Sequence, residues 1–155
     1  GIGLTNVIFT FIGINLIDKL GRKVLMYIGS IGYIISLSLI SLSFILEWGG
    51  IVLPIFLFLF IASHAIGQGA IIWVYISEIF PNHIRSYGQS FGISTHWVLA
   101  AIIPSFVPFL FGFIGPGLVF AFFAFMMVLQ LIFTHFIMPE TRGVSLEELA
   151  KKLII

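Results

Sequence analysis

The composition of this 155-residue chain excludes an ordinary soluble domain. Hydrophobic residues make up 60% of the sequence and charged residues only 8%, against roughly 25% charged residues in soluble domains. The net charge of +1 is too small for nucleic acid to be a partner. The absence of cysteine excludes disulfides and thiolate metal sites. With a mean hydropathy of +1.21, the sequence predicts an all-α integral membrane protein, and we expect neither a metal nor a cofactor.

The first two apolar stretches lie at about 1–17 and 24–46, and each approaches the length of a membrane-spanning helix. The chain starts at Gly1 without a basic leader, so we expect a piece of a longer product and not a chain that opens with a signal peptide. In the second stretch, Gly29, Gly32 and Ser36 recur on one helical face. Small residues let helix backbones approach closely in a membrane, so this face predicts helix packing.

The third stretch, at about 51–79, contains polar side chains inside an apolar run. Polar groups in a membrane must face protein or water, which makes His64 and Gln68 candidate ligand-binding residues. The triplet Gly67-Gln68-Gly69 is placed to break the helix, because two glycines weaken it and expose its backbone to a ligand. We therefore include Gly69 in the candidate site. An intact helix whose glycines serve close packing is the alternative.

The fourth stretch, at about 89–112, contains Trp97, and the third contains Trp73. Counting about 1.5 Å per residue from the loop between the two stretches places both tryptophans roughly 12 Å into the membrane. That is deeper than an interfacial anchor, and it favours apolar platforms against which a ligand stacks. His96 adds a group that can donate to and accept from hydroxyls. Plain core packing of the two tryptophans is the alternative.

The last apolar stretch lies at about 116–138, and a tail follows at 139–155. Ser145 and Glu148 have the spacing of a capping box, which predicts a short helix in the tail. Leu146, Leu149 and Leu153 would then share one side of that helix and lie along the membrane surface or under the bundle. A frayed polar tail is the alternative.

The basic residues alternate along the chain between its connections. All seven lie in the first connection, the third connection or the tail, namely Lys19, Arg22, Lys23, Arg85, Arg142, Lys151 and Lys152. The second and fourth connections contain none. This alternation follows the positive-inside rule for an odd number of spans, so it predicts five transmembrane helices and a cytoplasmic C-terminus, most simply in the plasma (inner) membrane.

Three motifs resemble those of the sugar porter family of the major facilitator superfamily. The segment Asp18 to Lys23 is similar to the acidic-x-x-Gly-Arg-Arg/Lys loop between its eighth and ninth helices, and Trp73 to Arg85 is similar to the tenth-helix motif W-x-x-x-x-E-I/L-F-P-x-x-x-R. Pro139 to Gly143 resembles the P-E-T-K/R-G signature that follows the twelfth helix. The resemblance implies five transmembrane helices forming an incomplete C-terminal half of a twelve-helix transporter, whose N-terminal half and seventh helix would be partners.

The resemblance also implies a function and roles for particular residues. It implies transport of a monosaccharide or related polyol by alternating access, as symport or facilitated diffusion, without enzymatic chemistry. Trp73 matches the tenth-helix tryptophan that contacts sugar, and His96-Trp97 stands where the family commonly has Gln-Trp or Asn-Trp. The implied cytoplasmic gate consists of Asp18, Arg22, Lys23, Glu78, Arg85, Glu140 and Arg142. Charges that only fix the topology are the alternative.

Three other functions compete with sugar transport. One is transport of a non-sugar organic solute by a protein of the same superfamily. A charged side chain at mid-depth, opposite in sign to the solute, would favour this function. Another is an intramembrane enzyme that uses His64, His96 or His135. The apolar spans contain no Asp or Glu at mid-depth that could complete a hydrolytic site. The third is a nontransporting sensor or fragment.

Overall fold

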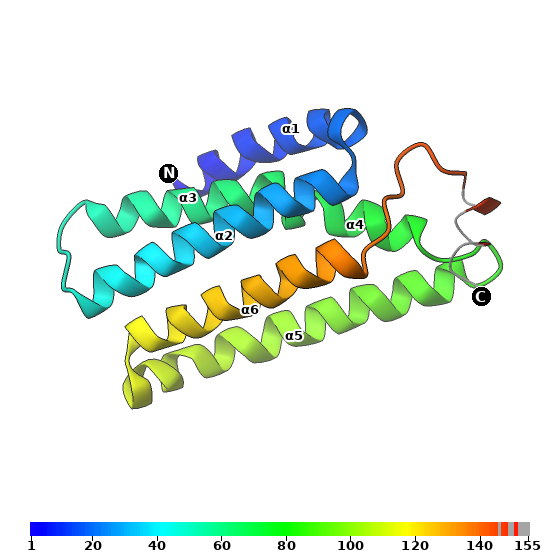
Figure 1. The fold of residues 1–155 in the computed structure, drawn as a ribbon. Coiled ribbons are helices and arrows are strands. Elements are labelled where there is room, and N and C mark those ends of the chain that lie inside the picture. The colour runs from blue at the N-terminus through cyan, green and yellow to red at the C-terminus, as the bar shows by residue number, and fades with distance from the viewer. Residues whose placement is uncertain (146, 149–150, 152–155) are drawn as a thin grey trace.

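The computed structural model describes residues 1–145, 147–148 and 151, and every regular element in them is a helix. The elements are α1 (Ile2–Leu20), α2 (Arg22–Ile45), α3 (Val52–Ile66), α4 (Gln68–Glu78), α5 (Arg85–Ile114) and α6 (Pro116–Phe136) (Figure 1). Because α3 and α4 act as one span, Val52–Glu78, five segments are long and apolar enough to cross a membrane. The predicted all-α membrane fold is confirmed.

The helices form a bundle in which α2 lies between α3 and α6, α1 packs on α3, and α5 runs along the outer side of α6 (Figure 1). The buried core is small. One cluster contains Ile17, Leu25, Ile71 and Met138, and a second contains Tyr33, Leu37 and Ala124. No residue of α5 is buried. Apolar surface on this scale needs lipid or further protein against it.

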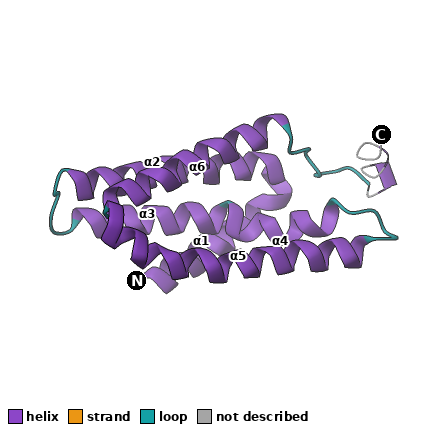
Figure 2. Cartoon of the chain, turned by 90° about the horizontal axis from the view of Figure 1, so that it is seen from below, coloured by secondary structure: helices purple, strands orange, loops and turns teal. Residues whose placement is uncertain are grey.

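The connections gather at two ends of the bundle. The α1–α2 junction at Gly21, the α4–α5 loop and the segment after α6 lie together at one end, and the α2–α3 and α5–α6 connections lie at the other (Figures 1 and 2). In the tail, the Glu148 backbone N–H donates to the Ser145 hydroxyl over 3.2 Å, as in a capping box. The three leucines expected on one side of a tail helix lie outside the described residues.

The small-residue face of α2 packs against the junction of α3 and α4. A Cβ atom added to Gly67 would lie 2.6 Å from the Gly29 Cα, and one added to Gly32 would overlap the Ser63 side chain. Backbones this close exclude any side chain between them. The face therefore serves helix packing, as the sequence predicts.

Candidate substrate site and cytoplasmic charge network

The third membrane span is broken at Gly67, as its glycine pair predicts. Helix α3 ends at Ile66 and α4 begins at Gln68, with Gly67 at φ −90° and ψ −110°. The side chains on both sides of the break are attached to α2. The Tyr33 hydroxyl is hydrogen-bonded to His64 Nδ1, and Gln68 Nε2 donates to the Ser30 hydroxyl over 3.1 Å. Helix α2 thus fixes the positions of both halves of the broken span.

Three of the predicted site residues form one aromatic cluster across α4 and α5. The ring centroids of Trp73 and His96 are 5.0 Å apart, those of Trp73 and Trp97 are 6.3 Å apart, and those of His96 and Trp97 are 5.4 Å apart. Trp73 is 40% exposed and Trp97 is 61% exposed. The two indoles are stacked on each other, with 29° between their ring planes. Partly exposed indoles can also stack against an apolar ligand face.

The other three predicted residues, His64, Gln68 and Gly69, lie together at the helix break. A Cβ atom added to Gly69 would lie 2.9 Å from His64 Nε2, and Gly69 is one helical turn before Trp73. The Gln68 Oε1 atom is buried and has no partner among the described residues. The Tyr33 contact to His64 was not predicted, because a tyrosine in an apolar span gives no signal of its partner.

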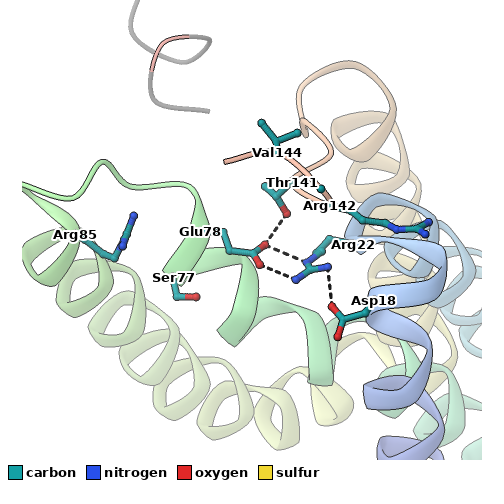
Figure 3. A pocket seen from close by; sticks show the side chains of 9 residues that line it. Asp18, Arg22, Ser77, Glu78, Arg85, Thr141, Arg142 and Val144 are labelled. Carbon is teal, nitrogen blue, oxygen red and sulfur yellow. Dashed lines mark hydrogen bonds and ion pairs between the residues drawn. The ribbon is translucent and has the colours of Figure 1, made fainter. Parts of the chain in front are cut away.

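The centre of the charge network is a bidentate ion pair between Arg22 and Glu78 (Figure 3). Arg22 Nη2 donates to Glu78 Oε1 over 2.6 Å, and Arg22 Nε donates to Oε2 over 3.0 Å. Asp18 accepts from Arg22 Nη1 over 3.2 Å, but its side chain is 83% exposed. Exposed pairs contribute little, whereas paired guanidinium bonds are strong and directional. The pair therefore fastens the start of α2 to the end of α4.

Among the described residues, Glu140 enters the network through backbone groups and not through a cation. Its Oε1 accepts the backbone N–H groups of Arg22, Thr141 and Arg142, and its Oε2 accepts that of Lys23, each over 3.0 Å. The first N–H groups of a helix have no partner within the helix and carry partial positive charge. Glu140 thus caps the N-terminus of α2 from the tail.

Thr141 joins the tail to the ion pair. Its hydroxyl donates to Glu78 Oε2 over 2.5 Å, and the residue is buried. This contact was not predicted from the sequence, because an uncharged threonine next to the charged members of the Pro139–Gly143 motif gives no signal of a carboxylate partner. The loop after α1, the end of α4 and the tail are therefore joined by one set of hydrogen bonds.

The remaining predicted gate residues surround this centre. Lys23 Nζ donates to the His135 carbonyl over 3.0 Å, and Arg85 Nε donates to the Phe80 carbonyl over 3.2 Å. Arg85 and Arg142 line a cavity of about 620 Å³ that also contacts Arg22 and Glu78. In Figure 3, Arg85 lies to one side of the ion pair. Across the described residues, Lys23, Arg85 and Arg142 form no ion pair with a carboxylate.

The comparisons with known proteins agree with this architecture. The family model described as "Sugar (and other) transporter" matches residues 1–153. The arabinose-proton symporter of Bacillus subtilis is 41% identical over 153 residues, covering 97% of this chain and 32% of the relative. The glucose transporter GlcP of Staphylococcus epidermidis is 40% identical over 162 residues, covering 99% of this chain and 35% of the relative.

A solved structure shows the same fold. The inward-open xylose transporter XylE from E. coli superposes with a TM-score of 0.90 at 31% identity, over 97% of this chain and 34% of that chain. A helical bundle of five apolar spans with these motifs belongs to the membrane transporters. The chain is a member of the sugar transporter family of the major facilitator superfamily, as its three motifs indicated.

Family membership confirms two further expectations. The chain is an integral membrane protein, and its relatives are transporters and not enzymes. The chain spans about a third of the length of the curated relatives it matches.

Proposed function

We propose that the chain forms the C-terminal part of a transporter that moves a monosaccharide or related polyol across a membrane by alternating access. The observation that carries the proposal is the cluster of Trp73, His96 and Trp97, which presents two partly exposed indoles beside an imidazole. Relatives named for arabinose, glucose and xylose transport support a sugar as the substrate.

The chemistry of a sugar fits this cluster. A pyranose presents apolar C–H faces, which stack on indoles, and a rim of hydroxyls, which an imidazole can bond as donor or acceptor. Trp73 and Trp97 would hold the ring, and His96 would bond a hydroxyl. His64, Gln68 and Gly69 would contribute from the helix break. A site with few polar groups among aromatic side chains favours a neutral polyol.

The charge network would act as a latch at the cytoplasmic side. Arg22, Glu78, Thr141 and Glu140 connect three segments through bonds that can form when this side closes and hydrate when it opens. A few charge-assisted hydrogen bonds give a switch of modest free energy. Arg85 and Arg142 would join this latch from the cavity that they line with it.

The orientation follows from the distribution of charge. All seven Lys and Arg lie in or beside the α1–α2 junction, in or beside the α4–α5 loop, or in the tail. These three connections follow every second span, so they lie on the same side of the membrane. Under the positive-inside rule this side is cytoplasmic. We therefore place the protein in the plasma (inner) membrane with its C-terminus inside, and the rest of the transporter would cover the apolar surfaces of α1 and α5.

Two alternatives to sugar transport are distinguished by the uptake experiment below. A charged organic solute would need an opposite charge near the aromatic cluster, and the one acidic side chain in α4, Glu78, is already paired with Arg22. A sensor would bind sugar without moving it.

The test is uptake of labelled arabinose, xylose, glucose and inositol by the full-length protein that carries this chain. We expect saturable uptake of one of them, lost in Trp73→Ala and His96→Ala at equal surface expression. Trp48→Ala is the matched control, because Trp48 lies in the α2–α3 connection, away from the cluster. Sugar binding without uptake would identify a sensor, and neither binding nor uptake would favour the non-sugar transporter.

A further inference from the structure

A groove of about 400 Å³ lies on the outside of the bundle between α2 and α6. It is lined by Tyr27, Ile31, Leu131, Ile132, His135 and Phe136. Ile31, Ile132 and Phe136 are 48%, 48% and 77% exposed. Neither the aromatic cluster nor the charge network uses these residues. A groove with aliphatic walls on a membrane-facing surface is suited to hold a hydrocarbon chain.

The groove changes from apolar to polar toward the end that holds Gly21 and the tail. The Tyr27 hydroxyl lies 2.8 Å from His135 Nδ1. When this hydroxyl donates to Nδ1, the imidazole carries its proton on Nε2 and presents a further donor. One turn nearer that end, Lys23 Nζ is bonded to the His135 carbonyl. Lys23, Tyr27 and Ile31 are spaced four residues apart, so they share one face of α2.

Lys23 differs from its neighbour Arg22 in how its charge is balanced. Arg22 pairs with Glu78 and Asp18. Within the described part of the chain, no carboxylate lies within 4.0 Å of Lys23 Nζ. A lysine ammonium has three N–H donors, and the His135 carbonyl takes one. Next to the polar end of the groove there is therefore a positive charge, with two donors that the described protein groups do not satisfy.

We infer that this groove binds one anionic phospholipid, with an acyl chain along Ile31, Leu131 and Ile132 and the headgroup phosphate at Lys23 and His135. The order of groups along the groove, from ammonium to phenol and imidazole to aliphatic, matches the order of phosphate, glycerol and acyl chain in a lipid. Charge complementarity selects a net negative headgroup over a zwitterionic one. Lipid binding in this groove does not depend on which substrate the protein transports.

Native mass spectrometry of the full-length protein tests this inference. The protein in detergent is titrated with phosphatidylglycerol and with phosphatidylcholine of the same acyl chains, and the ratio of the two bound species is measured. A basic residue near a membrane surface contributes about a fivefold preference for anionic lipid. We expect Lys23→Gln to lower the ratio by about this factor and Lys23→Arg to preserve it. Lys19→Gln, an equal change of charge at an exposed position on α1, should leave it unchanged.

A second variant tests the groove apart from the charge. Ile132→Trp fills the apolar part while Lys23 and its bond to α6 remain, so binding of both lipids should fall. An unchanged ratio in Lys23→Gln would overturn the inference. So would an equal decrease in Lys19→Gln, which would indicate attraction to the surface as a whole, or undiminished lipid binding in Ile132→Trp.

Discussion

Arg22 and Glu78 are joined by two hydrogen bonds of 2.6 and 3.0 Å, although 56 residues separate them in the chain. Arg22 is only 11% exposed and Glu78 only 21%, so water competes weakly for their bonds. This pair couples the α1–α2 junction to the end of the span that contains Trp73. We infer that the proposed latch is mechanically connected through α4 to the aromatic cluster.

Glu78→Gln should loosen the cytoplasmic latch. The amide keeps the shape but loses the charge, and bonds to charged groups contribute about 1.5 to 3 kcal/mol. In a full-length protein from which any other cysteines have been removed, a single Ser77→Cys in the cavity can report opening by its labelling with a membrane-impermeant maleimide. We expect labelling to become about tenfold faster. Glu47→Gln, at the other end of the bundle, is the control, and equal rates in all three proteins would contradict the latch.

Glu140→Gln should destabilise the fold through the N-terminus of α2. The amide has one oxygen to accept from the four N–H groups that Glu140 now serves, and it places an NH₂ group against the others. Loss of a helix cap costs about 1 kcal/mol, so the Tm of the purified protein should fall by a few degrees. Glu147→Gln makes the same change in the tail and should not move the Tm. Identical values for the two variants would argue against a capping role.

Gly29→Ala should disturb the helix break. The new methyl group would overlap the Gln68 side chain and lie 2.8 Å from the Gly67 Cα, and overpacking of this kind costs about 1 to 3 kcal/mol. Gly3→Ala is a matched control, because its Cβ meets nothing within 4 Å and alanine favours a helix. Thermal unfolding should show a lower Tm for Gly29→Ala only. If Gly29→Ala were as stable as Gly3→Ala, α2 would not clamp the break.

Tyr33→Phe should weaken sugar affinity through His64. The phenyl ring fills the buried Tyr33 site but cannot bond His64 Nδ1, so the imidazole would no longer be held beside Gly69. Loss of one hydrogen bond corresponds to an increase in KM of about two- to tenfold, with maximal uptake little changed. Tyr87→Phe removes a hydroxyl from a residue that is 79% exposed and should have no effect. An unaltered KM in Tyr33→Phe would remove His64 from the site.

Local features of the sequence predicted much of this arrangement. The apolar runs determine five spans, the glycine pair predicts the break at Gly67, and equal distances from one loop place Trp73 and Trp97 at one height. These inferences needed only spacing along one helix or a pair of neighbouring helices. The aromatic part of the candidate site therefore follows from α4 and α5 alone, where the indoles meet across the loop that joins them.

Contacts between segments that lie far apart in the chain could not be predicted from the sequence. The charges of Glu140 and Lys23 suggested ion pairs. The path of the tail brings Glu140 to backbone N–H groups, and the packing of α2 on α6 brings Lys23 to a helix carbonyl. The type of a residue does not indicate that its side chain will bond a backbone group. The bond between Tyr33 and His64 likewise depends on the rotation of α2 against α3, which small-residue packing sets in three dimensions.

The most direct test of the central claim is equilibrium binding of the transported sugar to the purified full-length protein and to Trp73→Phe and Trp73→Ala. If the indole stacks on the sugar, affinity should fall in the order Trp, Phe, Ala, with Trp73→Ala weaker by about tenfold, because an aromatic contact contributes about 0.5 to 1.5 kcal/mol beyond its buried area. Equal affinity in all three properly folded proteins would show that the sugar does not bind at the cluster of Trp73, His96 and Trp97.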